Sequence, residues 1–514
     1  MKKTFYLTPT ELDASLNAII FHGYSDFFPG PPEFKILNEK WPIFRDYLAG
    51  VNLEEYKPYR PMEMSAPKSK INLRWVSLLH PFDLVIYTAL VLLMREEIEQ
   101  ARVGADQEMV LSFRRAKAVD RLYDPLPSHG EFAERLLKKA TESSDGYVAL
   151  TDIADFYPRL YQHRVRNALD ALLSSRRKSK AAQLLEEQIL RGLTADGASL
   201  GIPIGPAASR PLAEAALIDV DEALLSFKID FIRYIDDSAI FGDSLEMVEW
   251  GIRQLGEIIY KNHGLTLQSA KTVIYSCKEY VGQHQYDEAE ENEVEKAFDE
   301  IVEQYFYDVF SIDDLTSRQR ETIDSMDFAE VLTSALEEEK VNYKKVAFIF
   351  EKLSAVQHPD LIPVILENLP RLYPVAHAIH GFFSEFEFAD EDEQKQVGES
   401  LLEPILTTSK MRALEYYSVW ILQLFSEHSS WNHSRTLLRI FRDADSEVVQ
   451  RYAALAIGKS GSRSSALLFK QQFSAASELT RTAMILSSSK LGRDERRHWI
   501  AGLRLTDFFE KNLV

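Results

Sequence analysis

The sequence contains almost no cysteine: Cys277 is the single one among 514 residues. One cysteine cannot form an internal disulfide bond, and no group of Cys and His residues has the spacing of zinc ligands. These absences argue against a disulfide-stabilised secreted protein and against a zinc protein. We therefore expect a reducing, cytoplasmic setting.

Long apolar segments are missing as well. Residues 1–5 are not followed by the apolar core of a signal peptide. The longest apolar run, residues 84–94, is about half the length of a bilayer span and predicts a buried helix. We expect no association with a membrane.

The chain has fewer basic than acidic residues. The chain has 59 Lys and Arg against 79 Asp and Glu, a formal net charge of −20, which excludes a uniformly basic surface for nucleic acid. Residues 286–514 hold 40 acidic and 25 basic side chains, whereas residues 1–285 hold 39 and 34. The acidic excess beyond residue 285, which begins with an acidic segment at 287–291, predicts a domain boundary there.

Periodicity divides the chain into three predicted parts. Residues 1–65 are rich in Pro and aromatic residues and predict a helical extension. Residues 66–285 mix short β-prone runs with helices, which indicates an α+β domain. Residues 286–514 follow helical periodicity almost throughout. With 46% hydrophobic residues, the chain is globular, and its length suits about two to four domains.

The C-terminal part contains weak internal similarity. Segments beginning at Ser409, Asp445 and Ser477 share apolar and small residues at helical spacing. Their separation of roughly 32–36 residues suits stacked helical hairpins of HEAT-like type. An irregular helical bundle is the alternative.

Two acidic motifs suggest a metal site. Asp236 and Asp237 lie between two β-prone apolar runs, and Asp152 ends an apolar strand earlier in the chain. Two Mg²⁺ ions a few ångströms apart require carboxylates that converge from separate strands. Asp152 and Asp236 are the predicted ligands, with Asp237 as a helper. A solvated hairpin tip is the alternative for the Asp pair taken alone.

A glycine-rich loop lies between these motifs in the chain. Gly201 and Gly205 allow close approach of the backbone to a ligand, and the small residues that follow predict the start of a helix. The alternative for the loop taken alone is an ordinary helix start without a ligand.

In chain order these segments resemble motifs A, B, C and D of reverse transcriptases. The motifs are Asp152-(x)4-Tyr157, Gly201-x-Pro203-x-Gly205-(x)3-Ser209-(x)2-Leu212-Ala213, Tyr234-x-Asp236-Asp237, and Gly264-Leu265-Thr266-Leu267 followed by Lys271-Thr272. Segments near Lys68, Arg74 and Arg114 are similar to the fingers motifs of group II intron and retron enzymes. The resemblance implies polymerase fingers and palm without a usual thumb, followed by the HEAT-like helical domain.

Within that family the chain is most similar to bacterial abortive-infection reverse transcriptases of the AbiK type, including their P2-prophage relative. The continuation to Tyr161-Gln162-His163, the motif B ending in Glu214 and the helical C-terminus support this. The resemblance implies a cytoplasmic bacterial enzyme of anti-phage defence that polymerises dNTPs. It also implies a covalently attached single-stranded DNA product, a homo-oligomer and a phage-encoded trigger.

The resemblance implies the following roles. Asp152 and Asp236 bind two Mg²⁺ ions, or Mn²⁺, with the Ile153 carbonyl as a further ligand, and Asp237 completes the acidic cluster. Lys271 is the general acid for the pyrophosphate leaving group.

Further residues are implied at the nucleotide. Tyr157 is the steric gate that favours dNTPs. The triphosphate contacts are Arg114, Lys68 and Arg74, and Asp155 and Gly205 complete the nucleotide site.

One departure from the family concerns the template. Reverse transcriptases commonly have Gln before the first glycine of motif B, where this chain has Leu200. This favours untemplated synthesis primed by a tyrosine hydroxyl. The candidate tyrosines are Tyr6, Tyr24, Tyr47, Tyr56 and Tyr59. Templated, retron-like copying of RNA is one alternative, and a non-catalytic defence scaffold with a relict palm is another.

Overall fold

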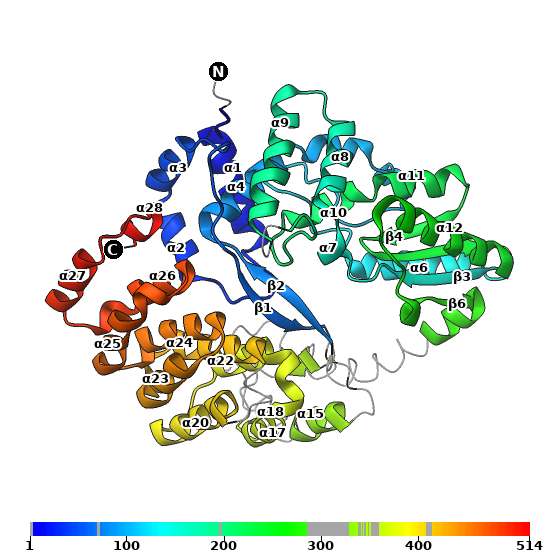
Figure 1. The fold of residues 1–514 in the computed structure, drawn as a ribbon. Helices are drawn as coiled ribbons and strands as arrows, with labels where there is room; N and C mark the ends of the chain where they lie inside the picture. Colours follow the sequence, from blue (N-terminus) through cyan, green and yellow to red (C-terminus); the bar gives the residue numbers. More distant parts are fainter. Residues whose placement is uncertain are drawn as a thin grey trace. The chain divides into compact units, whose positions relative to one another are not determined.

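The computed structural model describes residues 4–68, 72–194, 198–284, 328–337, 359–407 and 414–513, with six single positions between 341 and 350 (Figure 1). Within these ranges no helix is long and apolar enough to cross a membrane. The acidic segment at 287–291 lies outside the described residues.

Contacts divide the chain into two compact units. The first comprises Met1–Asp26, Leu37–Pro61 and Leu78–Phe298, and the second comprises Phe27–Ile36, Met62–Ser77 and Asp299–Val514. The expected boundaries at 1–65, 66–285 and 286–514 therefore need correction, because two early segments belong to the helical unit.

Buried polar contacts explain that correction. In the second unit Arg451 Nη1 lies 2.7 Å from Glu33 Oε1, and neither side chain is exposed by more than 1%. The backbone N–H of Ser65 donates to Glu415 at 2.8 Å. Both partners lie hundreds of residues further along the chain, so no local pattern indicates these contacts.

A four-stranded antiparallel sheet forms the centre of the first unit. Its strands are β3 (Tyr147–Asp152), β4 (Asp230–Tyr234), β5 (Asp237–Gly242) and β6 (Val273–Ser276), in the order β4-β5-β3-β6. One face packs on α6 (His129–Glu142) through Val148, Ile232 and Phe241, which share a core with Phe132 and Leu136.

The other face packs on α12 (Leu245–His263). A Cβ atom added at Gly251 would lie 2.7 Å from a methyl group of Ile240, so a glycine here permits close packing of helix on sheet. The mixed α+β character expected for this part of the chain is confirmed.

The first unit contains nine further α-helices whose bounds lie within its described residues. They are α1 (Pro9–His22), α3 (Trp41–Ala49), α4 (Pro81–Leu92), α5 (Arg95–Ala101), α7 (Phe156–Arg159), α8 (Gln162–Leu172), α9 (Arg176–Leu184), α10 (Ser209–Ala216) and α11 (Ile218–Ser226). Residues 81–91 of α4 are buried, as the apolar run predicts, although the helix ends at Leu92.

The described residues of the second unit are helical apart from a two-stranded sheet of β1 (Met62–Pro67) and β2 (Leu73–Leu78), whose last residue is assigned to the first unit. Its helices include α15 (Phe328–Glu337), α17 (Leu361–Glu367), α18 (Leu369–Leu372), α19 (Ala376–Glu385), α20 (Glu391–Thr407), α22 (Glu415–Glu427), α23 (Ser434–Asp443), α24 (Glu447–Ser460), α25 (Arg463–Gln472), α26 (Glu478–Ser487), α27 (Arg493–Gly502) and α28 (Phe508–Lys511). A further helix, α2 (Pro32–Glu39), begins in this unit and ends in the first. Helix α24 packs against both α22 and α26, which is the succession of neighbours that stacked hairpins produce.

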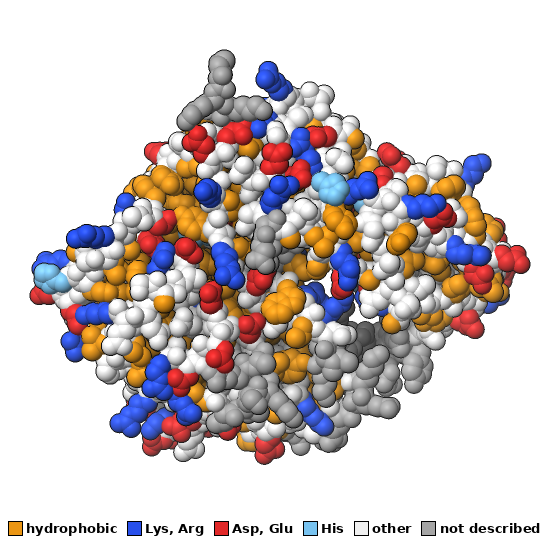
Figure 2. Space-filling model, viewed as in Figure 1, with side chains coloured by type: hydrophobic (Ala, Val, Ile, Leu, Met, Phe, Trp, Pro, Cys, Tyr) orange, Lys and Arg blue, Asp and Glu red, His pale blue; other side chains and the backbone are white. Residues whose placement is uncertain are grey.

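Charged side chains of both signs are mixed on the surface. On the face drawn in Figure 2, Lys and Arg side chains lie scattered among Asp and Glu side chains, and the coloured residues form no continuous basic stripe there. This agrees with the charge balance of the sequence.

Candidate active site

Strand pairing brings the two acidic motifs together. Asp152, the last residue of β3, is the register partner of Asp237, the first residue of β5. Asp236 lies in the turn before β5, and its carbonyl accepts a hydrogen bond of 3.2 Å from the N–H of Ile153. Carboxylates 84 residues apart in the sequence therefore lie at one end of the sheet.

The Asp152 carboxylate is buried, and one of its two oxygens has a hydrogen-bond partner. Its residue is 2% exposed, and its Oδ2 accepts a hydrogen bond of 2.6 Å from Lys271 Nζ. Its Oδ1 is buried and has no hydrogen-bond partner in the part of the chain that the structure describes. A buried acceptor without a donor needs a partner, and a bound cation would supply one.

Asp236 is destabilised as an anion. Burial, together with the charges of Asp152 and Asp237, raises the pKa of Asp236 to about 7. Like charges that converge in this way are costly unless a cation lies between them.

Lys271 partly offsets this charge. It ends the 3₁₀ turn Ser269–Lys271 that precedes β6. Partial burial lowers its pKa, but the hydrogen bond to Asp152 and the charges of all three carboxylates outweigh this, and the pKa is raised overall. The ammonium is therefore protonated at neutral pH, as a general acid requires.

Asp237 faces a different partner. Its Oδ2 lies 3.5 Å from Nε2 of His129, the first residue of α6. Asp237 therefore has a partner outside the acidic group, although its charge, like that of Asp152, still acts on Asp236. His129 gave no signal in the sequence, because its role depends on how α6 packs against the sheet.

The chemistry of these donors fits a hard divalent cation. The buried Asp152, with one unsatisfied oxygen, and the partly exposed Asp236 converge at this end of the sheet. Ile153 pairs with Leu267 in an isolated antiparallel β-bridge. The hydrogen bonds of this bridge are made by the Asp152 carbonyl and the Ala154 N–H, so the Ile153 carbonyl takes no part in them. Within the described ranges no three His, Cys, Asp or Glu side chains form a preassembled metal cluster.

Tyr157 lies near this acidic pair. Burial raises the pKa of its hydroxyl, the charge of Arg210 lowers it, and the charge of Asp236 raises it further. The pKa of the Tyr157 hydroxyl therefore depends on both the Asp236 carboxylate and the Arg210 guanidinium.

The glycine loop is attached to the same segment. The Tyr157 carbonyl accepts a hydrogen bond of 3.1 Å from the Ile202 N–H. Gly201 and Gly205 have φ of 90° and 122°, and a Cβ at Gly201 would lie 3.0 Å from the Pro158 carbonyl oxygen. Glycine is thus required at the first position by both conformation and space. Leu200 is 40% exposed beside this loop.

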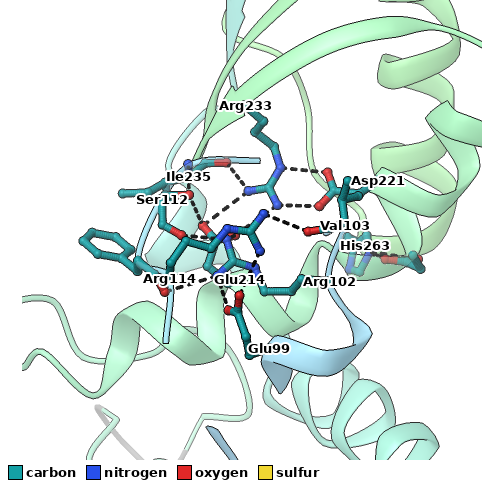
Figure 3. A network of polar contacts seen from close by, with 12 residues as sticks. Glu99, Arg102, Val103, Ser112, Arg114, Glu214, Asp221, Arg233, Ile235 and His263 are labelled. Carbon is teal, nitrogen blue, oxygen red and sulfur yellow. Dashed lines mark hydrogen bonds and ion pairs between the residues drawn. The ribbon is translucent and has the colours of Figure 1, made fainter. Parts of the chain in front are cut away.

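Two of the residues implied at the nucleotide, Arg114 and Asp155, have other partners within the first unit. Arg114 is buried, and its guanidinium donates to Glu99 at 3.2 Å and to the Val103 carbonyl at 2.7 Å (Figure 3). The prediction that Arg114 binds a triphosphate is not supported, because these partners already use the charge. Lys68 and Arg74 belong to the second unit.

Asp155 is the second of these residues. It is exposed with φ of 48°, and its carboxylate lies 3.5 Å from Arg159. Its side chain is engaged with the following helix instead of the acidic pair.

Arg210 is a cation that sequence reasoning missed. Its guanidinium donates to the Tyr123 hydroxyl and to Asp26, and it lies 5.0 Å from the centre of the Phe113 ring. The Phe113 ring in turn packs against Tyr234, two residues before Asp236. Because Asp26 and Tyr123 are distant in sequence, no motif could indicate this arrangement.

The candidate priming tyrosines differ in environment. Tyr6 and Tyr47 are exposed, at 43% and 38%. Tyr56 donates to the buried Asp83 at 2.6 Å, and the Tyr59 ring stacks on His80 at 3.7 Å. Burial raises the pKa of Tyr24. Tyr56 would have to break its hydrogen bond to Asp83 before it could react.

No family model and no curated protein matches the sequence. Two similar solved structures are telomerase from Candida albicans with a fragment of telomeric RNA, and apo telomerase from Candida tropicalis. The first is 10% identical with a TM-score of 0.32, over 74% of this chain and 64% of that chain. The second is 11% identical with a TM-score of 0.34, over 82% and 73%. This chain spans less than two thirds of the first protein, and likeness at these TM-scores does not establish a common fold.

Proposed function

We propose that the chain is a metal-dependent nucleotidyltransferase of the reverse-transcriptase kind that builds DNA from dNTPs. The observation that carries this proposal is the pair of converging carboxylates, Asp152 and Asp236, with the protonated Lys271 on Asp152. Asp152 and Asp236 would hold Mg²⁺ or Mn²⁺. When bound, such ions stabilise the negative charge that develops during phosphoryl transfer.

In this reaction a hydroxyl oxygen forms a bond to the α-phosphorus of a dNTP, and the bond from that phosphorus to the bridging oxygen breaks. The hydroxyl proton leaves to solvent, and pyrophosphate departs. Lys271 holds a proton on Nζ close to the acidic pair, where it can protonate the leaving group. Tyr157 interacts with Asp236 and would exclude a 2′-hydroxyl. Arg210 is the nearby cation: its side chain is more exposed than that of Arg114, and it would exchange Asp26 for phosphate oxygens when a nucleotide binds.

The finer proposal is untemplated, protein-primed synthesis in anti-phage abortive infection. Its support is the motif resemblance, Leu200 at the position of the usual Gln, and the exposure of the residues Tyr6 and Tyr47. A tyrosine oxygen would then take the place of the primer hydroxyl, and the product would remain attached to the chain. A homo-oligomer and a phage-encoded trigger belong to this proposal.

The test incubates the full-length protein with Mg²⁺ or Mn²⁺ and a labelled dNTP. We expect label that stays with the protein through phenol extraction, and mass spectrometry of the modified peptide would locate the tyrosine. Asp236→Ala should abolish labelling. The matched control is Asp230→Asn, because Asp230 starts the same hairpin but pairs with Lys139.

Three results would count against parts of the proposal. Equal labelling by Asp236→Ala protein would refute the site. A product that matches an RNA sequence would favour templated copying. Absence of incorporation with every divalent metal would favour the non-catalytic scaffold.

A further inference from the structure

The turn that presents Asp236 has a strained backbone. Ile235 has φ of 57°, in the left-handed region that a β-branched residue rarely adopts. Such a conformation persists only where the surrounding structure holds it. Neighbouring groups must therefore hold Ile235 in this conformation.

Two side chains bind both backbone polar groups of Ile235 (Figure 3). The Ile235 N–H donates to Ser112 Oγ at 2.9 Å, and the Ile235 carbonyl accepts from Arg233 Nη1 at 2.8 Å. Ser112 comes from a loop more than a hundred residues earlier, so this contact is a tertiary one. Together the two bonds fix the peptide groups on either side of Ile235.

Both side chains are anchored on Glu214 of α10, which is 0% exposed. Ser112 Oγ donates to Glu214 Oε1 at 2.6 Å, and Arg233 Nη2 lies 3.0 Å from Oε2. Arg102 also donates to Oε2, at 2.9 Å. Burial alone would raise the pKa of Glu214, but the charges of Arg233 and Arg102 and the Ser112 hydroxyl outweigh it and lower the pKa.

Asp221 holds the other side of Arg233. Its carboxylate accepts from Arg233 Nε at 2.8 Å and from Nη2 at 2.6 Å. With both carboxylates in place, the Arg233 guanidinium has no freedom to turn away from the Ile235 carbonyl. Apolar residues can often replace such a buried ion network without loss of stability, but they could not bond a strained peptide group.

We propose that Ser112 and Arg233 are positioning residues. They hold Ile235 in its left-handed conformation and thereby fix the Asp236 carboxylate opposite Asp152. The inference rests on the proposed function, in which these two carboxylates hold the metal. Partners of this kind behind a metal ligand change metal affinity by about 10-fold to 100-fold when removed.

The experiment measures Mn²⁺ binding to the full-length protein by electron paramagnetic resonance, with Asp236→Asn to identify the site. Ser112→Ala should weaken binding about 10-fold to 100-fold, whereas Ser112→Thr, which keeps the hydroxyl, should bind like the wild type. The matched control is Ser15→Ala. Ser15 is also buried in the first unit and donates to the Val85 carbonyl at 2.7 Å, so its loss should cost similar stability and leave Mn²⁺ affinity unchanged.

A second variant separates positioning from folding. Asn adopts the left-handed conformation more readily than Ile, so Ile235→Asn added to Ser112→Ala should restore part of the lost Mn²⁺ affinity. A merely structural role for Ser112 predicts no such recovery. The proposal is overturned if Ser112→Ala binds Mn²⁺ as tightly as Ser15→Ala, or if Ile235→Asn restores nothing.

The Mn²⁺ measurement also distinguishes failure of the positioning role from failure of the proposed function. If the wild type binds Mn²⁺ through Asp236 but incorporates no nucleotide, the proposed function fails, while the effect of Ser112→Ala on affinity still supports the positioning role. If Asp236→Asn does not reduce Mn²⁺ binding, both proposals are overturned, because no metal site then exists for Ser112 to shape.

Discussion

Replacing Asp236 by Asn should stabilise the metal-free protein at neutral and alkaline pH. In the wild type, burial and the charges of Asp152 and Asp237 raise the pKa of Asp236 to about 7 from an ordinary 3.8. Asn keeps the shape of the side chain and removes the charge. The substitution therefore removes the cost of ionising this carboxyl inside the folded protein.

The magnitude follows from the pKa shift. At about 1.36 kcal/mol per pKa unit, a rise from 3.8 to about 7 corresponds to about 4 kcal/mol. Solvent around the partly exposed carboxyl screens some of the repulsion, so we expect a gain of about 1–3 kcal/mol above pH 8.

The pH dependence has a definite sign. The pKa of Asp236 is higher in the folded than in the unfolded protein, so the folded protein binds more protons between pH 3.8 and about 7. Wild-type stability therefore falls as the pH rises through this window. The advantage of Asp236→Asn should be small near pH 4, grow across the window, and level off above it.

The assay is unfolding of the full chain in EDTA at several pH values, with Asp230→Asn as the control. Adding Mg²⁺ should stabilise the wild type by mass action, about 2.7 kcal/mol at 100 times the dissociation constant, and should not stabilise Asp236→Asn. The reasoning is refuted if the variant is no more stable than the wild type at pH 8, or if its advantage does not change with pH.

Two further predictions concern the cations of the site. Lys271→Ala should lower nucleotide incorporation by about 10²-fold to 10⁴-fold. It should also remove the fall in rate at alkaline pH, because the raised pKa of Lys271 sets that fall. An unchanged alkaline fall in rate would exclude Lys271 as the general acid. Arg210→Ala should raise the KM for dNTPs about 10-fold to 100-fold in steady-state assays, whereas Asp26→Asn, which frees the guanidinium, should leave KM equal or lower. Equal KM for Arg210→Ala and wild type would mean that this guanidinium does not contact the nucleotide.

Local chemistry of the sequence determined the elements that present the site. The β-prone runs before Asp152 and around Asp236-Asp237 predict the strands and the hairpin, and the structure pairs them so that the carboxylates converge. The positive φ angles of Gly201 and Gly205 agree with the expected close backbone approach. The helical character expected beyond residue 285 is likewise confirmed in the residues described there. These features depend on strand period, turn residues and helical spacing, which act over a few residues.

Only the tertiary structure decided which partners each cation has. Arg114 has the type and position of a phosphate ligand, but Glu99 and Val103 hold it in a buried network. Arg210 lies near Tyr157 instead, through partners at residues 26 and 123. An ion pair depends on where two distant segments meet, and no pattern within either segment contains that information.

The dependence on distant contacts also explains the domain boundaries and the support of the turn before Asp236. Composition predicts a division near residue 285, but the buried contact of Glu33 with Arg451 draws an early segment into the second unit. The sequence alone determined that Asp236 follows a tight turn. Its strained residue Ile235 is held by Ser112, a serine that no motif distinguishes, because hydrogen bonds to a strained backbone form only once the distant loop has packed beside it.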